Sequence, residues 1–247
     1  GLVVERRCFL ALSAAALAGA GLARPAYARL APGDALTFDE FLVAVLPEAR
    51  KLVADTSADG QDAYLRAVAR EAVRLGDAPQ PSWRDSGQSL GPGTFIGANL
   101  GPGGASTEPF VALHWKMDPG TRIEAHAHTH GNVCTLGLEG EALVNNYEMD
   151  GARDFDRAGV FRVRRTVRQV LSRGSVNLVN LERNYVHGTI AGAAGARGLD
   201  ITTRIRPRHP DVPCLRLERA VPGQDGAFEA VWSDLAGMKG EDASLLR

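Results

Sequence analysis

The chain has 247 residues, of which 45% are hydrophobic and 6% aromatic, and its formal net charge is −1. This length and apolar content suffice for one sizeable core, and a charge so close to zero argues against a nucleic-acid partner or charge-driven binding to a membrane surface. The 28 glycines and 13 prolines are scattered along the chain, which favours short strands joined by tight turns.

Residues 1–28 have the features of an export signal. Arg6-Arg7 precede an apolar run over residues 9–22, and Ala26-Tyr27-Ala28 offers a small-x-small cleavage site. The Arg-Arg-x-Phe-Leu order is that of a twin-arginine signal. We therefore expect a periplasmic or secreted protein with no membrane span after processing. The alternatives are an ordinary secretory signal and an uncleaved anchor.

Residues 29–92 are expected to form a helical segment and a linker. Over residues 37–75, apolar side chains recur at spacings of three and four, with Pro47 as an interruption and Asp59-Gly60 as the turn between two helices. From residue 79 to residue 92 the content of Pro, Gly and Ser rises, which marks a linker. These helices are expected to pack against the main domain and to carry no chemistry.

From residue 93 onward the pattern changes to short β runs separated by turn residues. Pairs such as Glu139-Gly140, Asp150-Gly151 and Arg173-Gly174 supply the breaks. Many strands at close spacing without intervening helices favour a barrel or sandwich, so the sequence predicts one mainly all-β domain over residues 93–247 with a C-terminal extension. The expected strands are residues 95–100, 110–117, 133–138, 142–147, 160–170, 176–181, 198–205 and 228–232.

The histidine pair His126 and His128 carries the strongest chemical signal. Side chains at i and i+2 of a strand project from the same face, so both imidazoles can point into a barrel and share one metal ion. A Pro-Gly turn at residues 119–120 precedes the pair, and Gly131 follows it. A single histidine on an apolar face is usually a satisfied core residue, whereas this pattern predicts two metal ligands.

The spacing Gly120-x5-His126-x-His128, closing at Gly140, resembles the first motif of the cupin superfamily. That resemblance implies a cupin-type double-stranded β-helix barrel. The superfamily's usual metal-binding glutamate falls at Val133, so the chain departs from the motif there. Without that carboxylate, a metal ion has neutral imidazole ligands and open positions, as oxygen-activating iron enzymes require.

A looser match to the second cupin motif, Pro-x-Gly-x-x-His, ends at His187. Glu182 replaces the proline, and Asn184 stands in the glycine position. Asparagine tolerates the left-handed backbone conformation better than most residues. The resemblance therefore implies that His187 is the third metal ligand, on a later strand.

Three-histidine cupins without the glutamate include the thiol dioxygenases, and the chain resembles the cysteamine dioxygenase and plant cysteine oxidase family. Residues 184–187, the alanine-rich residues 191–196 as a short loop, and the strand Leu199-Asp200-Ile201 follow that family's order. The resemblance implies Fe(II), with O2 and a small thiol or N-terminal cysteine as substrates and a sulfinate as product. It also implies that Asp200 is a catalytic acid lining the site; the alternative is a strand-end aspartate that satisfies turn amides.

The remaining histidines receive different interpretations. His130 is in phase with the metal-binding pair, so it is expected either to face the substrate or to support a metal ligand, provided that the strand continues past Thr129. His114, on a strand, is expected to be structural. His209, between Arg208 and Pro210, is expected on a surface loop.

Two cysteines, Cys134 and Cys214, remain beyond the signal. They could pair in an oxidising compartment, but the position of Cys134 in an apolar strand favours a buried free thiol. Cys134 is one residue out of phase with the cysteine that cross-links to tyrosine in cysteine dioxygenases. One residue in a strand means the opposite face, so no cross-link is predicted.

Two other functions fit the sequence. One is a three-histidine cupin acting on a carbonyl or aromatic substrate, and the other is a non-catalytic periplasmic cupin that binds a metal or small ligand. A thiol enzyme needs polar anchors such as Arg122 or Arg204, whereas an aromatic substrate needs a wide apolar mouth. Imidazole-only sites also suit Zn, Ni and Cu, so iron depends on the resemblance. The sequence does not fix the oligomeric state, and the cupin resemblance allows a homodimer, since cupin barrels often pair through edge strands.

Overall fold

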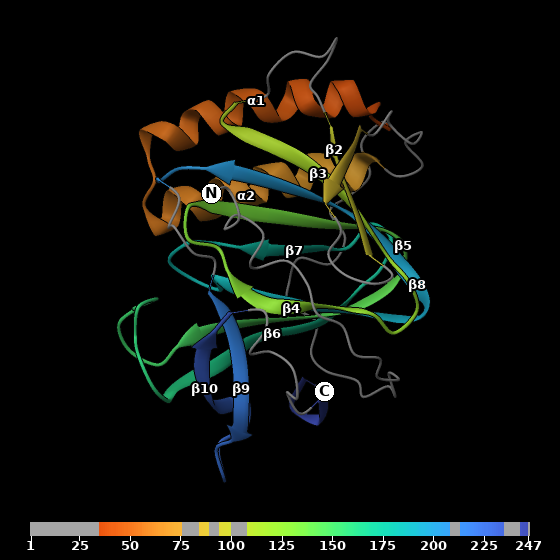
Figure 1. The fold of residues 1–247 in the computed structure, drawn as a ribbon. Helices are drawn as coiled ribbons and strands as arrows, with labels where there is room; N and C mark the ends of the chain where they lie inside the picture. Colours follow the sequence, from red (N-terminus) through yellow and green to blue (C-terminus); the bar gives the residue numbers. More distant parts are fainter. Residues whose placement is uncertain are drawn as a thin grey trace, which may run out of the picture.

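The computed structural model describes residues 35–75, 84–88, 94–99, 108–207, 213–234 and 243–246, so the predicted export signal lies outside the described residues. In these residues no helix is both long enough and apolar enough to cross a membrane. The fold is mainly β, with two helices at its N-terminal side (Figure 1). Its elements are α1 (Phe38–Ala54), α2 (Ala58–Ala72), η1 (Val73–Leu75), β1 (Arg84–Gln88), β2 (Thr94–Asn99), β3 (Phe110–Met117), β4 (Arg122–Ala127), β5 (Gly131–Met149), β6 (Phe161–Leu171), β7 (Val176–Val179), β8 (Val186–Arg204), β9 (Cys214–Ala220), β10 (Ala227–Ser233) and η4 (Ala243–Leu246).

Both α-helices begin at side-chain caps. Thr37 and Glu40 form a reciprocal capping box at the start of α1. Ser57 caps α2 by accepting a hydrogen bond from the Gly60 backbone N–H at 3.1 Å. The turn predicted at Asp59-Gly60 therefore lies earlier in the chain, and both residues belong to the first turn of α2. A Cβ at Gly60 would lie 2.3 Å from the Asp55 carbonyl oxygen, so glycine here permits a close approach.

The sequence suggested that Pro47 interrupts the first helix, but α1 continues through this residue. It lies inside the helix on the exposed face. Proline there removes the hydrogen bond to the carbonyl of Val43, whose side chain is itself 61% exposed. Because that carbonyl is on the solvent side, water can replace the missing donor, and the buried face of the helix continues unbroken.

The strands close into an antiparallel barrel because β5 and β8 are long enough to pass through two sheets. The first sheet contains β1, β2, β3, the C-terminal half of β8, the N-terminal half of β5, and β7. The second contains β4, the N-terminal half of β8, the C-terminal half of β5, and β6. The β9–β10 hairpin joins β4 to β6 and completes a closed ring of strands. This closed antiparallel barrel with two helices at its N-terminal side is the cupin-type architecture that the first motif implied.

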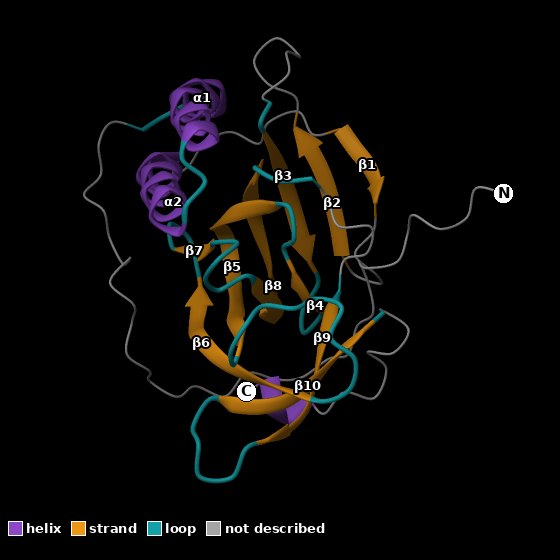
Figure 2. Cartoon of the chain, turned by 90° about the vertical axis from the view of Figure 1, so that its left-hand side faces the viewer, coloured by secondary structure: helices purple, strands orange, loops and turns teal. Residues whose placement is uncertain are grey.

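Three buried apolar clusters separate these layers. Figure 2 shows α1 and α2 on one side of the barrel and the β9–β10 hairpin at the opposite end. The first cluster joins the helices to the outer face of the first sheet and includes Phe41, Leu42, Leu65, Cys134, Leu136, Leu199 and Ile201. The second fills the space between the sheets with Ile96, Trp115, Met117, Val144, Leu171 and Ala191. The third lies between the second sheet and the β9–β10 hairpin and includes Ala125, Ala127, Leu143, Tyr147, Val186, Ile190, Leu215, Phe228 and Leu246.

Several predicted strand limits were wrong. The break at Glu139-Gly140 is a bulge inside β5, where Gly140 has a φ of 68°. The alanine-rich residues 191–196, expected as a loop, belong to β8. β9 was not predicted, and β1 lies within the segment assigned to a linker. By contrast, β3 has the predicted bounds, and the breaks at Asp150-Gly151 and Arg173-Gly174 are confirmed.

Candidate metal centre

The three predicted ligands His126, His128 and His187 meet at one place. His126 on β4 and His187 on β8 are direct cross-strand partners. His128 follows the end of β4, where its backbone N–H donates to the Tyr185 carbonyl at 2.8 Å. The ring centroids of the three imidazoles are 4.8 to 5.0 Å apart.

The imidazoles point into the space between the two sheets. Ala125 and Ala127, which flank His126, belong to the third cluster, as does Val186 beside His187. Since successive side chains of a strand alternate in direction, the histidines project from the opposite face, toward the first sheet. One nitrogen atom from each ring lies within 4.8 Å of the others.

The donor atoms fit a divalent metal ion. Nε2 of His128 lies 3.0 Å from Nε2 of His187. Two ligands at right angles and about 2.1 Å from one ion are separated by about 3.0 Å. Nδ1 of His126 lies 2.9 Å from the Glu124 carbonyl oxygen, which fixes the proton on Nδ1 and leaves Nε2 as the ligand atom. The buried Nδ1 of His187 has no hydrogen-bond partner in the described part of the chain.

Burial keeps the three imidazoles neutral, as metal ligands must be. It lowers the pKa of His126 below its usual value, although the hydrogen bond to the Glu124 carbonyl opposes the shift. For His128 and His187, burial and the neighbouring imidazoles together lower the pKa well below the usual value. The rings can therefore offer lone pairs at neutral pH without first losing a proton.

Among the described residues, the ligand cluster contains the three histidines and no carboxylate. Val133, in the usual glutamate position, is fully buried on β5. Asn184, in the glycine position of the second motif, has a φ of 58°, so the expected left-handed conformation is confirmed. That conformation leads the chain from the β7–β8 loop into β8, three residues before His187.

Asp200 lies outside the ligand cluster but faces the same interior. Its neighbours Leu199 and Ile201 pack against the helices, so its own side chain projects between the sheets. The indole N–H of Trp115 donates to Oδ1 of Asp200 at 3.1 Å. Burial raises the pKa of Asp200 to about 6, and this hydrogen bond opposes the rise. Asp200 can therefore exchange a proton near neutral pH.

His130 does not continue the phase of the histidine pair. β4 ends at Ala127 and the chain bends at residues 129–130, so alternation along the strand no longer orients the His130 side chain. Its carbonyl accepts hydrogen bonds from the backbone N–H groups of Ile205 and Arg206 at 3.0 and 3.1 Å. His130 is not part of the ligand cluster.

His114 lies on β3 away from the cluster, and its Nε2 lies 3.4 Å from an Arg197 nitrogen. Burial, together with Arg197, lowers the pKa of His114 to about 4. This neutral, partnered ring fits the predicted structural role. His209 lies outside the described residues.

Neither arginine considered as a substrate anchor joins the histidine cluster. Arg122 forms a buried ion pair with Glu124 at 2.8 Å. Arg204 is 59% exposed and lies 3.7 Å from Glu108. Both guanidinium groups therefore already face carboxylates of the chain.

Cys134 and Cys214 are both buried, and no disulfide joins them. Cys134 belongs to the helix-facing cluster, so its thiol points away from the histidines, as its phase on the strand predicted. Cys214 is the cross-strand partner of His126. The predicted absence of a cross-link at Cys134 agrees with this orientation.

Sequence reasoning missed two polar residues of the interior, Asn146 and Asn177. Asn146 is the cross-strand partner of His187. Asn177 on β7 is the partner of Thr135, which in turn pairs with Asp200. The sequence did offer a sign of a polar interior position at Asn146, because two consecutive asparagines interrupt an otherwise apolar strand at residues 142–147.

No protein-family model and no curated protein matches this sequence. Solved structures that match include an oxalate oxidase, with 15% identity, 47% of this chain and 53% of that chain covered, and a TM-score of 0.34. An oxalate decarboxylase of Bacillus subtilis matches with 14% identity, 50% and 28% covered, and a TM-score of 0.38. The polyketide cyclase RemF from Streptomyces resistomycificus matches with 14% identity, 51% and 74% covered, and a TM-score of 0.35. The chain thus spans about half the length of the oxalate oxidase. The closed antiparallel barrel is consistent with a cupin-type fold.

Proposed function

We propose that this protein is a metal-dependent cupin that holds one divalent ion on His126, His128 and His187. The observation that carries the proposal is the convergence of three buried, neutral imidazoles whose ligand atoms lie within 4.8 Å of one another. The Glu124 carbonyl orients the His126 ring, so this ligand is pre-positioned before any ion binds.

We further propose that the ion is Fe(II) and that the protein is a thiol dioxygenase. With three neutral imidazoles and no carboxylate, Fe(II) would supply open coordination positions for a thiolate and O2, with a sulfinate as product. The absence of a carboxylate from the described cluster supports this choice. So does the resemblance of residues 184–187 and 199–201 to the cysteamine dioxygenase and plant cysteine oxidase family.

Asp200 is the residue suited to hold a proton beside the reaction. Its pKa of about 6 lets the carboxyl group exist in both forms near neutral pH. The Trp115 indole fixes the orientation of this group through the hydrogen bond to Oδ1. In the thiol dioxygenase reading, Asp200 would accept the proton that the substrate thiol releases.

The proposal is tested first by metal binding and then by oxygen consumption. Each of the variants His126→Ala, His128→Ala and His187→Ala should hold less than about a tenth of the Fe(II) bound by the parent protein, because each loses one of three ligands. His114→Ala, which removes a histidine outside the cluster, is the matched control. Full metal occupancy in the His187 variant would remove this residue from the ligand set.

Oxygen uptake by the Fe(II)-loaded protein should then depend on an added thiol. The thiols to compare are cysteamine, cysteine, 2-mercaptoethanol and a peptide with an N-terminal cysteine. Uptake should fall to background in the three histidine variants. If Fe(II) binds but no thiol stimulates uptake, the metal site stands and the dioxygenase assignment fails.

A second candidate function is a three-histidine cupin that transfers protons on a carbonyl substrate. Asp200 favours it, since a carboxyl group with a pKa of about 6 inside the barrel suits general acid–base catalysis. Such an enzyme would retain activity with Zn(II) and without O2. Activity that requires both Fe(II) and O2 would exclude this candidate.

We also propose that the protein acts after export to the periplasm or the exterior. Arg6-Arg7 and the Ala26-Tyr27-Ala28 site support this location. Replacing both arginines with lysine should leave the protein in the cytoplasm if the twin-arginine route is used, and cell fractionation would measure this. Unchanged export of the double variant would favour the ordinary secretory route.

A further inference from the structure

Glu182, in the β7–β8 loop, bridges two arginines from separate parts of the chain. Its Oε1 accepts a hydrogen bond from Nη2 of Arg206, which lies two residues beyond the end of β8. Its Oε2 lies 3.2 Å from Nη1 of Arg153, in the β5–β6 loop. Partial burial raises the pKa of Glu182, but the two guanidinium groups outweigh that effect and hold the pKa below its usual value. Glu182 is therefore ionised at neutral pH and ties three chain segments together.

His128 is the metal ligand whose position depends on this loop. His126 and His187 are direct cross-strand partners in the β4–β8 ladder. His128 lies one residue beyond the end of β4, and its backbone N–H donates to the Tyr185 carbonyl at 2.8 Å. Tyr185 belongs to the same loop as Glu182. A shift of the β7–β8 loop would therefore move the backbone acceptor that holds His128.

The two arginines contact the chain on both sides of that ligand. The guanidinium carbon of Arg153 lies 5.6 Å from the centroid of the Tyr185 ring. The backbone N–H of Arg206 donates at 3.1 Å to the carbonyl of His130, which follows the ligand by two residues. Through these contacts, Glu182 restrains both the residue that holds the ligand and the segment that comes after it.

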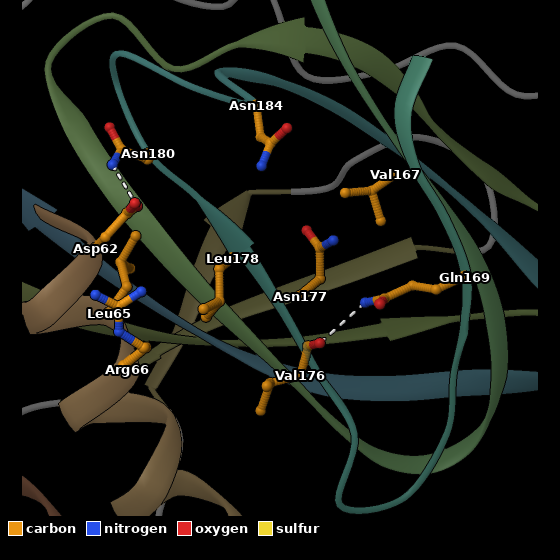
Figure 3. Close-up of a pocket in the computed structure, with 10 residues that line it drawn as sticks. All are labelled: Asp62, Leu65, Arg66, Val167, Gln169, Val176, Asn177, Leu178, Asn180 and Asn184. Carbon is orange, nitrogen blue, oxygen red and sulfur yellow. Dashed lines mark hydrogen bonds between the residues drawn. The ribbon is translucent and has the colours of Figure 1, made fainter. Parts of the chain in front are cut away.

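Helix α2 holds the opposite side of the β7–β8 loop. Nδ2 of Asn180 donates to Oδ1 of Asp62 at 2.6 Å (Figure 3). Nη1 of Arg183 donates to Oδ2 of the same carboxylate, also at 2.6 Å. The residues that flank Leu181-Glu182 are thus fixed to the helix. The Glu182 side chain links this anchored turn to the segments around the metal centre.

Glu182 stands where the second cupin motif has a proline. A proline would restrict the loop through its fixed φ but would have no N–H. The Glu182 N–H donates to Oδ1 of Asn180 at 2.8 Å, so the glutamate keeps a hydrogen bond and adds two ion pairs. The side chains of Glu182 and Arg206 are 32% and 36% exposed. Salt therefore screens this restraint, which it could not do to a proline ring.

We propose that Glu182 is a positioning residue for the metal centre, which holds the His128 segment in place through Arg153 and Arg206 and makes the metal affinity sensitive to salt. The inference rests on the proposed function in taking His128 as a metal ligand. Two partly exposed ion pairs correspond to a factor of roughly two to thirty in an equilibrium constant, so we expect effects of about fivefold.

The first test uses the full chain without added metal. Glu182→Gln keeps the length of the side chain and the backbone N–H but removes the charge. Hydrogen exchange of the His128 amide, followed by NMR, should become about fivefold faster, whereas amides of β5 such as that of Tyr147 should be unchanged. Glu218→Gln is the matched control, because Glu218 on β9 is similarly exposed and pairs with Arg216 at 2.6 Å. An equal change in both variants, or no change in either, would overturn the proposal.

The second test measures Co(II) binding, because the visible absorption of this ion reports its ligands. Glu182→Gln should bind Co(II) about fivefold more weakly than the parent protein and Glu218→Gln at about 0.1 M salt. Raising the salt concentration to about 1 M should weaken binding to the parent protein and hardly affect Glu182→Gln, so that the two affinities converge. An affinity ratio that stays the same at both salt concentrations would show that charge is not the cause.

A double-mutant cycle tests whether Glu182 acts through Arg206. Glu182→Gln combined with Arg206→Gln should bind Co(II) no more weakly than Glu182→Gln alone. Additive losses would refute the bridge. If the parent protein binds no Co(II) but the His128 exchange rates still differ, the proposed metal function fails and the role of Glu182 in holding His128 stands. If the parent protein and Glu182→Gln bind Co(II) equally well, the metal site stands and the role of Glu182 fails alone.

Discussion

Gln61 connects the helical segment to the loop that leads into the metal site. It is fully buried in the first turn of α2. Its Nε2 donates to the Thr56 carbonyl at 3.0 Å, and its Oε1 accepts from the Leu181 backbone N–H at 2.9 Å. Leu181 belongs to the β7–β8 loop, six residues before His187. Gln61→Met keeps the length of the side chain and removes both hydrogen bonds.

In Gln61→Met, the Leu181 N–H and the Thr56 carbonyl each lose a hydrogen-bond partner, and these two losses determine how far the free energy of unfolding falls. Leu181 is fully buried, so its N–H would have no water to replace Gln61 and would cost about 1–3 kcal/mol. The Thr56 carbonyl belongs to a partly exposed residue, so hydration should offset most of its loss. We expect Gln61→Met to lower the free energy of unfolding by about 2 kcal/mol, and hence the Tm by roughly 6 °C for a domain of this size.

Urea unfolding followed by circular dichroism measures this loss. The midpoint should fall while the m value stays constant, because the surface exposed on unfolding is unchanged. Gln224→Met is the matched control, since Gln224 is exposed and its replacement should change stability by less than about 0.5 kcal/mol. If both variants lost the same amount, the reasoning that Gln61 ties α2 to the loop would be refuted.

Two further predictions concern Asp200 and the bulge glycine of β5. Because the pKa of Asp200 rises from 3.8 to about 6 on folding, the folded state binds this proton more tightly, so the metal-free protein should lose about 3 kcal/mol of stability as pH rises from about 4 to 6. Asp200→Asn should flatten that part of the curve in urea melts at several pH values, and an unchanged curve would contradict the assigned pKa. In the same melts, Gly140→Ala should lower the free energy of unfolding more than Gly223→Ala does. Both glycines have a positive φ, so both variants strain the backbone. A Cβ at Gly140 would also lie 2.2 Å from the Gly195 carbonyl oxygen, whereas a Cβ at Gly223 would have nothing within 4 Å. Equal losses would mean that only the backbone conformation matters.

Local periodicity was sufficient to predict that His126 and His128, which lie close together in the sequence, belong to one cluster. The spacing of His126 and His128 places both on one face, and the bracketing turns confined the strand. His187 required the second motif, because its pairing with His126 joins residues sixty-one apart in the chain. Strand alternation cannot orient His130, because β4 ends at Ala127 and the chain bends after His128, so a role for His130 stays a prediction.

The length of β8 could not be read from local composition. Its middle is rich in Gly and Ala, which indicates a loop when only β propensity is considered. In the barrel these small residues allow close packing: a Cβ at Gly198 would lie 2.0 Å from the Trp115 ring, and one at Gly188 would lie 3.0 Å from the Ala125 backbone. The requirement for small residues comes from neighbours distant in the sequence. For the same reason, Asn177 could not be assigned to the interior from its own segment.

The passage of β5 and β8 through both sheets has a consequence for how the molecule opens. The two strands pair with each other from Gly131–Arg204 at one end to Tyr147–Val186 at the other. Neither sheet can separate from its neighbour without breaking this shared ladder, so the two layers should unfold in a single cooperative step. Amide hydrogens of β5 and β8 should accordingly exchange with solvent only through global unfolding, whereas those of α1, which lies outside the ladder, can exchange through local opening. A ligand or metal ion bound between the sheets would then slow exchange along the full length of both strands.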